Sequence, residues 1–279
     1  MISRPLAKAH LVLSLLLPLG LPLGLPLALG GCPAVYPELG TRTHPIPAGR
    51  QLDPPPPPDV RWLKIASATV PEKTRGGRPW SANGKSDPYA KLFANGKELF
   101  RTPVQSNTLA PTWPDGPKGN FKIGAEDKLR IEVWDSNPIN DKPICVQDIG
   151  RVPDDALMER RIRVTCEAGG DVVILYEEAH AVQGAGLWYE LRADAAGVTR
   201  MLDGSPAQRA GLEPGDDLLE IGGRKVTSMT ADEVKSAMNA NPFAGQPLLV
   251  KHAKEGAVLT LTLKEGPIYP LYDQFGSIE

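Results

Sequence analysis

Residues 203–226, DGSPAQRAGLEPGDDLLEIGGRKV, hold a helix start, a helix stop and a turn within one short segment. Ser205 can cap a short helix, because its hydroxyl accepts a backbone N–H of the first turn, and Pro206 suits the first helical position. Gly211 can take the left-handed conformation that ends the helix. The PGD sequence at 214–216 then turns the chain into an apolar run. The segment therefore predicts a compact helix–turn–strand unit.

The same segment resembles the core of bacterial PDZ domains, which reads GSPAxxAGLxxGDxIxxING. Gly222 stands where that family often has Asn or Asp. Downstream, residues 230–233 (TADE) form a capping box that predicts a helix to about Asn239, and two strands follow at 247–253 and 258–265. The resemblance covers residues 181–266. It implies a small α+β domain with the form of a partly open barrel.

The resemblance also implies a peptide-binding groove, because PDZ domains bind an extended peptide, often a C-terminus, as an added strand beside a helix. Residues 186–189 (GLWY) match the carboxylate-binding loop, and Trp188 replaces its second glycine, where a large ring crowds a carboxylate. A C-terminus and an internal or blocked peptide both remain candidate ligands. The predicted peptide-binding residues are Gly186, Leu187, Trp188, Tyr189, Ala231, Val234 and Met238.

A purely structural PDZ domain with a closed groove is the alternative. The tail, residues 267–279, carries Tyr269, Tyr272 and Phe275 and is long enough to cover such a groove.

Upstream, from Val60, the chain consists of short apolar runs between turn residues, a pattern typical of an antiparallel β-sandwich. The runs are at 60–70, 87–94, 97–104, 128–135 and 171–178. Four motifs occur in order: GKSDPYAK at 84–91, TLAPTW at 108–113, LRIEVWD at 129–135 and DIG at 148–150. They resemble the motifs of C2 domains. We assign residues 60–180 to a C2-like β-sandwich, so the predicted fold class is mainly β.

Many C2 domains bind calcium through aspartates on two loops at one end and then dock on phospholipid. The resemblance places candidate calcium ligands at Asp87, Asp135, Asn137, Asp141 and Asp148, of which Asp87 and Asp135 match the family pattern firmly. Calcium takes six to eight oxygen ligands, so two firm carboxylates make a weak site. The alternative is a calcium-independent domain in which Asp87 stabilises a turn.

The loop before Asp87 is basic around a tryptophan. Its predicted membrane contacts are Lys73, Arg75, Arg78, Trp80 and Lys85. Such a loop suits an anionic membrane, because the cations meet phosphates while the indole ring inserts. The alternative is a solvated charged loop with Trp80 packed on the edge of the sandwich.

The start of the chain has the layout of an export signal, with Arg4 and Lys8 before an apolar run and the small residues of LALGGC at 27–32. LGGC resembles the bacterial lipobox, in which the cysteine is lipidated and becomes the first mature residue. We assign residues 1–31 to a lipoprotein signal peptide and lipidation to Cys32. An uncleaved anchor and a plain signal peptide are the alternatives.

The two cysteines other than Cys32 suit an exported, oxidising location. Cys145 and Cys166 remain as an even pair, which predicts a disulfide; two free buried thiols are the alternative.

Residues 32–59 are rich in proline and poor in apolar side chains, so they predict an extended tether that holds the folded part away from the membrane. A disordered leader without a geometric role is the other interpretation.

The formal net charge of −2 gives no indication of nucleic-acid binding, and no GxSxG, SxxK or HExxH motif occurs, so we expect no enzyme. We expect a lipid-anchored adaptor of the bacterial cell envelope, in the periplasm or at the outer membrane. Its PDZ groove would bind a hydrophobic segment or C-terminus of an exported protein, while the C2-like domain positions it on a membrane or partner. This function requires that the cleft beside residues 231–238 is not filled by the chain's own side chains or C-terminal segment.

The alternative function is a calcium- or phospholipid-responsive membrane module with a mainly structural PDZ domain.

Overall fold

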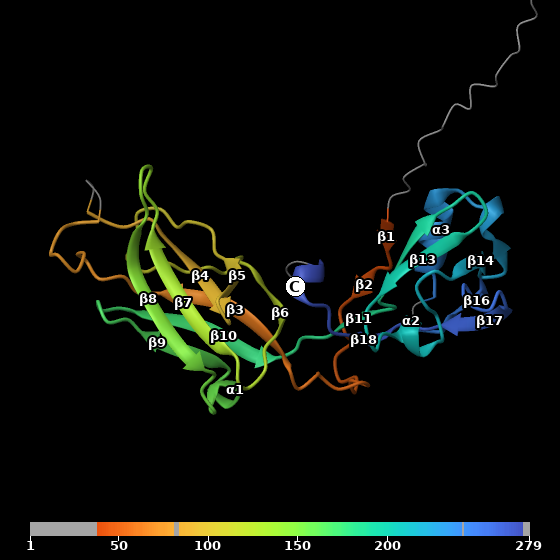
Figure 1. Ribbon diagram of the computed structural model, residues 1–279, viewed down its shortest axis with the longest axis horizontal. Coiled ribbons are helices and arrows are strands. Elements are labelled where there is room, and N and C mark those ends of the chain that lie inside the picture. The colour runs from red at the N-terminus through yellow and green to blue at the C-terminus, as the bar shows by residue number, and fades with distance from the viewer. Residues whose placement is uncertain (1–37, 81–83, 242, 276–279) are drawn as a thin grey trace, which may run out of the picture. The chain divides into compact units, whose positions relative to one another are not determined.

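The computed structural model describes residues 38–80, 84–241 and 243–275 (Figure 1). The predicted signal peptide and Cys32 lie outside these residues. A β-sandwich extends from Val60 to Glu178, and an α+β domain follows from Val182 to Ile268. The mainly β fold class is thereby confirmed. Among the described residues, no helix has the length and apolar character that crossing a bilayer requires.

The sandwich consists of two four-stranded sheets whose neighbouring strands are antiparallel. One sheet has the order β6 (Lys118–Lys122), β3 (Val60–Ala68), β10 (Asp171–Glu178), β9 (Arg161–Thr165), and the other β5 (Lys97–Arg101), β4 (Pro88–Ala94), β7 (Lys128–Asp135), β8 (Lys142–Arg151). A short helix, α1 (Ala156–Glu159), precedes β9. The five apolar runs of the sequence form β3, β4, β5, β7 and β10 as predicted, whereas β6, β8 and β9 were not predicted.

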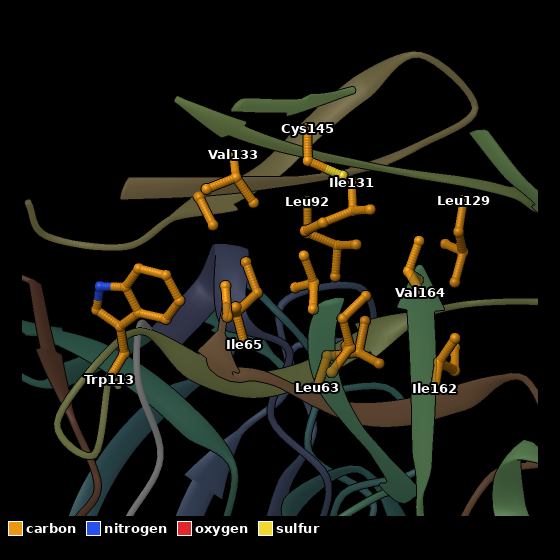
Figure 2. Packing of buried hydrophobic residues seen from close by; sticks show 14 of the residues in the cluster. Leu63, Ile65, Leu92, Trp113, Leu129, Ile131, Val133, Cys145, Ile162 and Val164 are labelled. Carbon is orange, nitrogen blue, oxygen red and sulfur yellow. The ribbon is translucent and has the colours of Figure 1, made fainter. Parts of the chain in front are cut away.

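The core of the sandwich lies between the two sheets. Figure 2 shows Leu92, Ile131 and Val133 pointing from one sheet toward Leu63 and Ile65 of the other. These side chains occupy alternate positions on their strands, because successive residues of a strand face opposite sides of the sheet. Each of the five is at most 1% exposed.

The disulfide between Cys145 and Cys166 is present, as predicted, with the two Cα atoms 5.5 Å apart. Cys145 lies within β8. Cys166 follows directly after β9. Since β8 and β9 are edge strands of different sheets, the bond joins the two layers of the sandwich.

The second domain is built around an open sheet with the path β1-β12-β13-β14-β16-β17, with β15 paired to β14, and a smaller sheet β18-β11-β2. Its elements are β11 (Val182–Gly184), β12 (Leu187–Leu191), β13 (Ala196–Met201), α2 (Pro206–Arg209), β14 (Asp217–Ile221), β15 (Arg224–Lys225), η1 (Val226–Ser228), α3 (Ala231–Met238), β16 (Gln246–Lys251), β17 (Val258–Leu263) and β18 (Gly266–Ile268). The short helix α4 (Tyr272–Phe275) follows the domain and packs on the core of the sandwich through Tyr272. The two predicted helix starts are present: Ser205 caps α2, and Thr230 with Glu233 forms a capping box on α3.

Two strands of the second domain come from the proline-rich leader. β1 (Glu38–Gly40) pairs with β12, and β2 (Thr43–His44) pairs with β11. Residues 38–44, which the sequence assigned to the extended tether, are thus paired with the second domain. These residues contain no proline, so their backbone N–H groups are available to a sheet edge.

Candidate functional site

The candidate groove lies between β12, near the edge of the main sheet, and α3. Leu187 and Tyr189 of β12 are 1% and 0% exposed, and Val234 and Met238 of α3 are 1% and 5% exposed. All four belong to one hydrophobic cluster. Three of the predicted peptide-binding residues, Leu187, Tyr189 and Met238, thus contribute to the groove mainly as its buried floor.

A cavity of about 490 Å³ opens between the end of β12 and the start of α3. It is lined by Leu39, Leu191, Arg192, Ala193, Val226, Met229, Ala231, Asp232, Val234 and Lys235. Ala231 and Val234 therefore lie where the sequence placed a small apolar pocket. This end of the groove has space for an apolar side chain.

The other end of the groove is occupied by β1 from the leader. Glu38, Leu39 and Gly40 pair with Glu190, Tyr189 and Trp188 in an antiparallel ladder. Leu39 is half-buried and packs on the hydrophobic cluster beneath the groove. The chain's own segment thus lies beside β12 as an added strand, the mode of binding expected of a peptide ligand.

Thr41 continues this pairing at the loop that the sequence assigned to carboxylate binding. Its backbone N–H donates to the Leu187 carbonyl at 3.0 Å, and the Leu187 N–H donates to the Thr41 hydroxyl at 3.4 Å. The chain then passes the loop, and the Arg42 N–H donates to Asn239 Oδ1 at 2.8 Å at the end of α3. The occupant is therefore an internal segment and not a C-terminus.

Gly186 sets the turn of this loop with a φ of +70°. A Cβ atom at Gly186 would lie 2.7 Å from Cβ of Ser205. The position thus requires glycine both for its left-handed backbone and for the close approach of α2.

Glu38 is held by two side chains of β13. The Thr199 hydroxyl donates to Glu38 Oε1 at 2.6 Å, and Arg200 Nε donates to Glu38 Oε2 at 2.9 Å. The Thr199 hydrogen bond, opposed by some desolvation and reinforced by Arg200, holds the pKa of Glu38 below its usual value. An ionised carboxylate is therefore favoured at this position.

Gly40 lies against Trp188, the residue that replaces glycine in the loop motif. A Cβ atom at Gly40 would be 3.1 Å from Trp188 Nε1 and 3.3 Å from Cδ1. Trp188 is 9% exposed, and the Arg200 guanidinium stacks 4.0 Å from the centroid of its ring. Because Arg200 also packs on the ring, the ring has little room to move away, and it favours a residue without a side chain.

At one end of the sandwich, the candidate calcium ligands are engaged with one another. Asp135, 1% exposed, accepts the Asp87 N–H on Oδ1 at 2.8 Å and the Asn137 side-chain amide on Oδ2 at 2.9 Å. Asp87 Oδ1 in turn accepts the Asn107 N–H at 2.6 Å. Neutral amide donors thus hydrogen-bond oxygens of both carboxylates.

Asp141 is engaged in the same way. The Asn137 N–H donates to Oδ1 at 3.0 Å and the Tyr89 hydroxyl donates to Oδ2 at 2.7 Å, and both bonds lower the pKa of Asp141. Burial first, and then Asp141, raise the pKa of Tyr89 to about 12.

Asp148 does not join this set. It lies on β8 opposite Arg130, five positions along β7 from Asp135, which is roughly 17 Å at the rise of a strand. The proposed five-residue ligand set is therefore not assembled. Within residues 38–80, 84–241 and 243–275, no group of three or more His, Cys, Asp or Glu side chains is arranged to hold a metal ion.

Models of known protein families match both the β-sandwich and the α+β domain. A C2 domain family model matches residues 66–152, and a PDZ domain family model matches residues 182–242. The chain carries a C2 domain followed by a PDZ domain.

Two yeast proteins match a small share of the chain. Tricalbin-1 of Saccharomyces cerevisiae is 42% identical over 65 residues, and tricalbin-2 of the same yeast is 39% identical over 61 residues. Each match covers 21% of this chain and 5% of the yeast protein. The matched segment is thus about a twentieth of the length of these relatives. The match therefore gives no information on the activity of this chain as a whole.

Solved structures match this chain at low identity and with low TM-scores. A solved C2 domain is 20% identical with a TM-score of 0.34, and the match covers 42% of this chain and 96% of that one. The calcium-bound pair of C2 domains of extended synaptotagmin 2 is 19% identical with a TM-score of 0.33, and the match covers 45% of this chain and 48% of that one. The bound calcium is a property of extended synaptotagmin 2.

The basic loop of the C2 domain differs from the membrane-contact prediction at its tryptophan. Trp80 is 3% exposed, belongs to the core of the sandwich, and donates from Nε1 to the Pro71 carbonyl at 2.7 Å. The ring thus packs in the sandwich, as the alternative interpretation expects, and does not project from the surface. Lys73, Arg75, Arg78 and Lys85 are exposed.

Within the described residues, which end at Phe275, the tail does not cover the PDZ groove. The Tyr272 ring stacks on Phe121 with centroids 5.0 Å apart and lies 6.0 Å from Phe100. Tyr269 donates its hydroxyl to the Pro54 carbonyl at 2.8 Å. The segment of the chain that occupies the groove is the leader, and sequence reasoning missed its residues Glu38, Leu39 and Gly40 with their partners Thr199 and Arg200.

Replacement of Asn137 by aspartate is expected to destabilise the C2 domain by about 2 kcal/mol, because a buried carboxylate loses a hydrogen bond and gains a like-charged neighbour. The Asn137 amide now donates to Asp135, so the change places two carboxylates together. Thermal unfolding with and without millimolar CaCl₂ measures the effect. We expect calcium to restore stability to Asn137→Asp and to leave the unsubstituted chain unchanged.

Asn140→Asp is the matched control, because it adds the same charge to an exposed position of the same loop. A clear calcium-dependent rise in the unfolding temperature of the unsubstituted chain would contradict the assignment of the aspartates to internal hydrogen bonds.

Proposed function

We propose that this chain is a non-enzymatic, lipid-anchored adaptor of the bacterial cell envelope, whose PDZ groove binds an extended apolar segment of another exported protein. The observation that supports this function is the cavity between β12 and the start of α3, which stays open although β1, the chain's own segment, pairs along β12 at the other end of the groove. The adjoining cavity between Leu191, Val226 and Val234 offers room for an apolar side chain. The groove thus accepts the kind of ligand that the proposal requires.

In this proposal the leader keeps the PDZ groove close to the anchor, whereas its proline-rich composition predicts a spacer that holds the folded part away from the membrane. Cys32 is six residues before Glu38, so a lipid on Cys32 would be at most about 20 Å from the edge of the PDZ groove while β1 is paired. The groove would then face partners at or in the membrane that holds the anchor.

The C2 domain would add a second, calcium-independent contact with an anionic surface. Lys73, Arg75 and Arg78 are exposed on one loop, and basic residues near such a surface contribute about 1 kcal/mol each. We assign this loop an electrostatic role without insertion of Trp80.

A peptide library presented to the full chain tests the adaptor function. Two forms are used, both with Cys32→Ser, and one also with Leu39→Asp, which places a charge on the apolar floor and so unpairs β1. We expect apolar extended peptides to be enriched on the Leu39→Asp form. Ala231→Phe, at an exposed position that lines the cavity, is expected to abolish the enrichment. Absence of enrichment on both forms would rule the function out.

A further inference from the structure

We propose that residues 38–44, here called the strap, are a displaceable internal ligand of the PDZ groove whose sequence specifies the partner. The partner segment is expected to carry an acidic residue, an apolar residue and a glycine in succession, as Glu38, Leu39 and Gly40 do. This inference rests on the proposed function, because it names the ligand class of the same groove and what regulates its access.

The acidic position is specified by β13. Thr199 and Arg200 bind both oxygens of the Glu38 carboxylate at 2.6 and 2.9 Å. Hydrogen bonds in which the donor or the acceptor is ionised are roughly twice as strong as neutral ones. Arg200 and Thr199 are therefore the residues that select an acid at this position.

The glycine position is specified by Trp188. Any side chain in place of Gly40 would bring its Cβ to within 3.1 to 3.3 Å of the indole ring. Arg200 stacks on the same ring, so one residue fixes both the acidic and the glycine positions. Trp188, which replaces a glycine of the family loop motif, thus selects ligand segments that have glycine opposite its ring.

The strap is attached lightly enough to be displaced. Glu38, Gly40, Arg42 and Thr43 are exposed, and Leu39 is half-buried. Its ladder with β12 contains only the three residues of β1, and its ladder with β11 only the two residues of β2. A segment that also fills the adjoining cavity between Leu191 and Val234 would bury more apolar surface than the strap does.

Because the strap is tethered, it competes at an effective concentration in the millimolar range. For an intrinsic dissociation constant of about 0.1 mM, this competition weakens the binding of an external segment about 10-fold. Groove access would therefore be low until a better ligand of the same pattern is present.

The test uses a labelled, N-acetylated and C-amidated peptide of residues 37–43, PELGTRT, and fluorescence anisotropy with the full chain carrying Cys32→Ser. We expect Leu39→Asp and Gly40→Val, introduced separately in the chain, each to bind this peptide about 10-fold more tightly than the parent. Gln51→Asp, which adds a charge at an exposed leader position outside the strap, should bind like the parent.

Selectivity is measured with two altered peptides on the Leu39→Asp chain. Glu38→Lys and Gly40→Val in the peptide are each expected to weaken binding at least about 10-fold. Arg200→Glu in the chain should reverse the first preference, so that the peptide carrying Glu38→Lys binds more tightly than the original.

Equal binding of PELGTRT by all chain forms would overturn the inference. It would also fail, with the proposed function intact, if library peptides bind the Leu39→Asp chain but lack the pattern and are not displaced by PELGTRT. If no peptide binds any form, the proposed function itself fails. A dimer of the parent chain that Leu39→Asp abolishes would assign the groove to the strap of a second copy and overturn the separate partner.

Discussion

Replacement of Trp80 by alanine is expected to lower the free energy of unfolding of the C2 domain by about 3 to 5 kcal/mol, the usual range for truncation of a buried aromatic side chain. Trp80 is 3% exposed and donates a hydrogen bond to the Pro71 carbonyl. The Trp80 carbonyl oxygen accepts a hydrogen bond from Lys142 Nζ at 2.9 Å, which connects the basic loop to β8. Differential scanning calorimetry of the full chain, with the PDZ transition as an internal reference, measures the loss.

The triple variant Lys73→Glu, Arg75→Glu, Arg78→Glu is the complementary control. These side chains are exposed, so each change should alter stability by no more than about 0.5 kcal/mol. Binding to phosphatidylglycerol vesicles should instead fall by on the order of 100-fold, with or without calcium. If Trp80→Ala lost vesicle binding while the unfolding free energy stayed the same, the tryptophan would be a membrane contact and its packed position would be misassigned.

The strands that the sequence predicted are those with regular alternation and strong family motifs. β8 was missed because its exposure pattern does not alternate, and its pairing with β7 shifts register between Leu129 and Arg130 and again between Val133 and Trp134. Such bulges break the period of two on which strand prediction depends. β6, with the sequence KGNFK, has too few apolar residues to predict a strand at all.

The candidate calcium site shows why matching carboxylates to a motif does not establish a metal site. Asp87 and Asp135 occupy the expected end of the sandwich, and they lie close together. Whether they bind a cation depends on what else faces them, and Asn137 supplies an N–H donor to Asp135. A sequence pattern gives the residue type at a position but not the direction in which its amide points.

The strap is the part of the site that composition concealed. Proline content assigned residues 32–59 to a spacer, but the stretch from Glu38 to His44 is proline-free between Pro37 and Pro45. That interruption is a local signal that a strand is possible. The strand with which it pairs is distant in sequence, since Thr41 and Leu187 are 146 residues apart in the chain. The pattern of residues within one segment does not indicate which distant strand that segment pairs with.

Removal of the disulfide by Cys145→Ala with Cys166→Ala is expected to lower the stability of the C2 domain by about 3 kcal/mol. The bond closes a loop with a sequence separation of 21, and on chain-entropy reasoning a loop of this size constrains the unfolded chain by about that amount. Both cysteines are buried, at 4% and 5% exposure, and they join β8 of one sheet to the end of β9 in the other. Calorimetry of the full chain should show a lower C2 transition and an unchanged PDZ transition.

Reduction of the parent chain with dithiothreitol provides the matched comparison, because it breaks the bond without deleting the sulfur atoms. We expect the reduced parent to lose less stability than the double alanine variant, since alanine also leaves small cavities at two buried positions. The order of stability should therefore be oxidised parent, reduced parent, double variant. A reduced parent as stable as the oxidised one would mean that the strands on either side hold the two edges together without the bond, and that the crosslink contributes nothing to the folded sandwich.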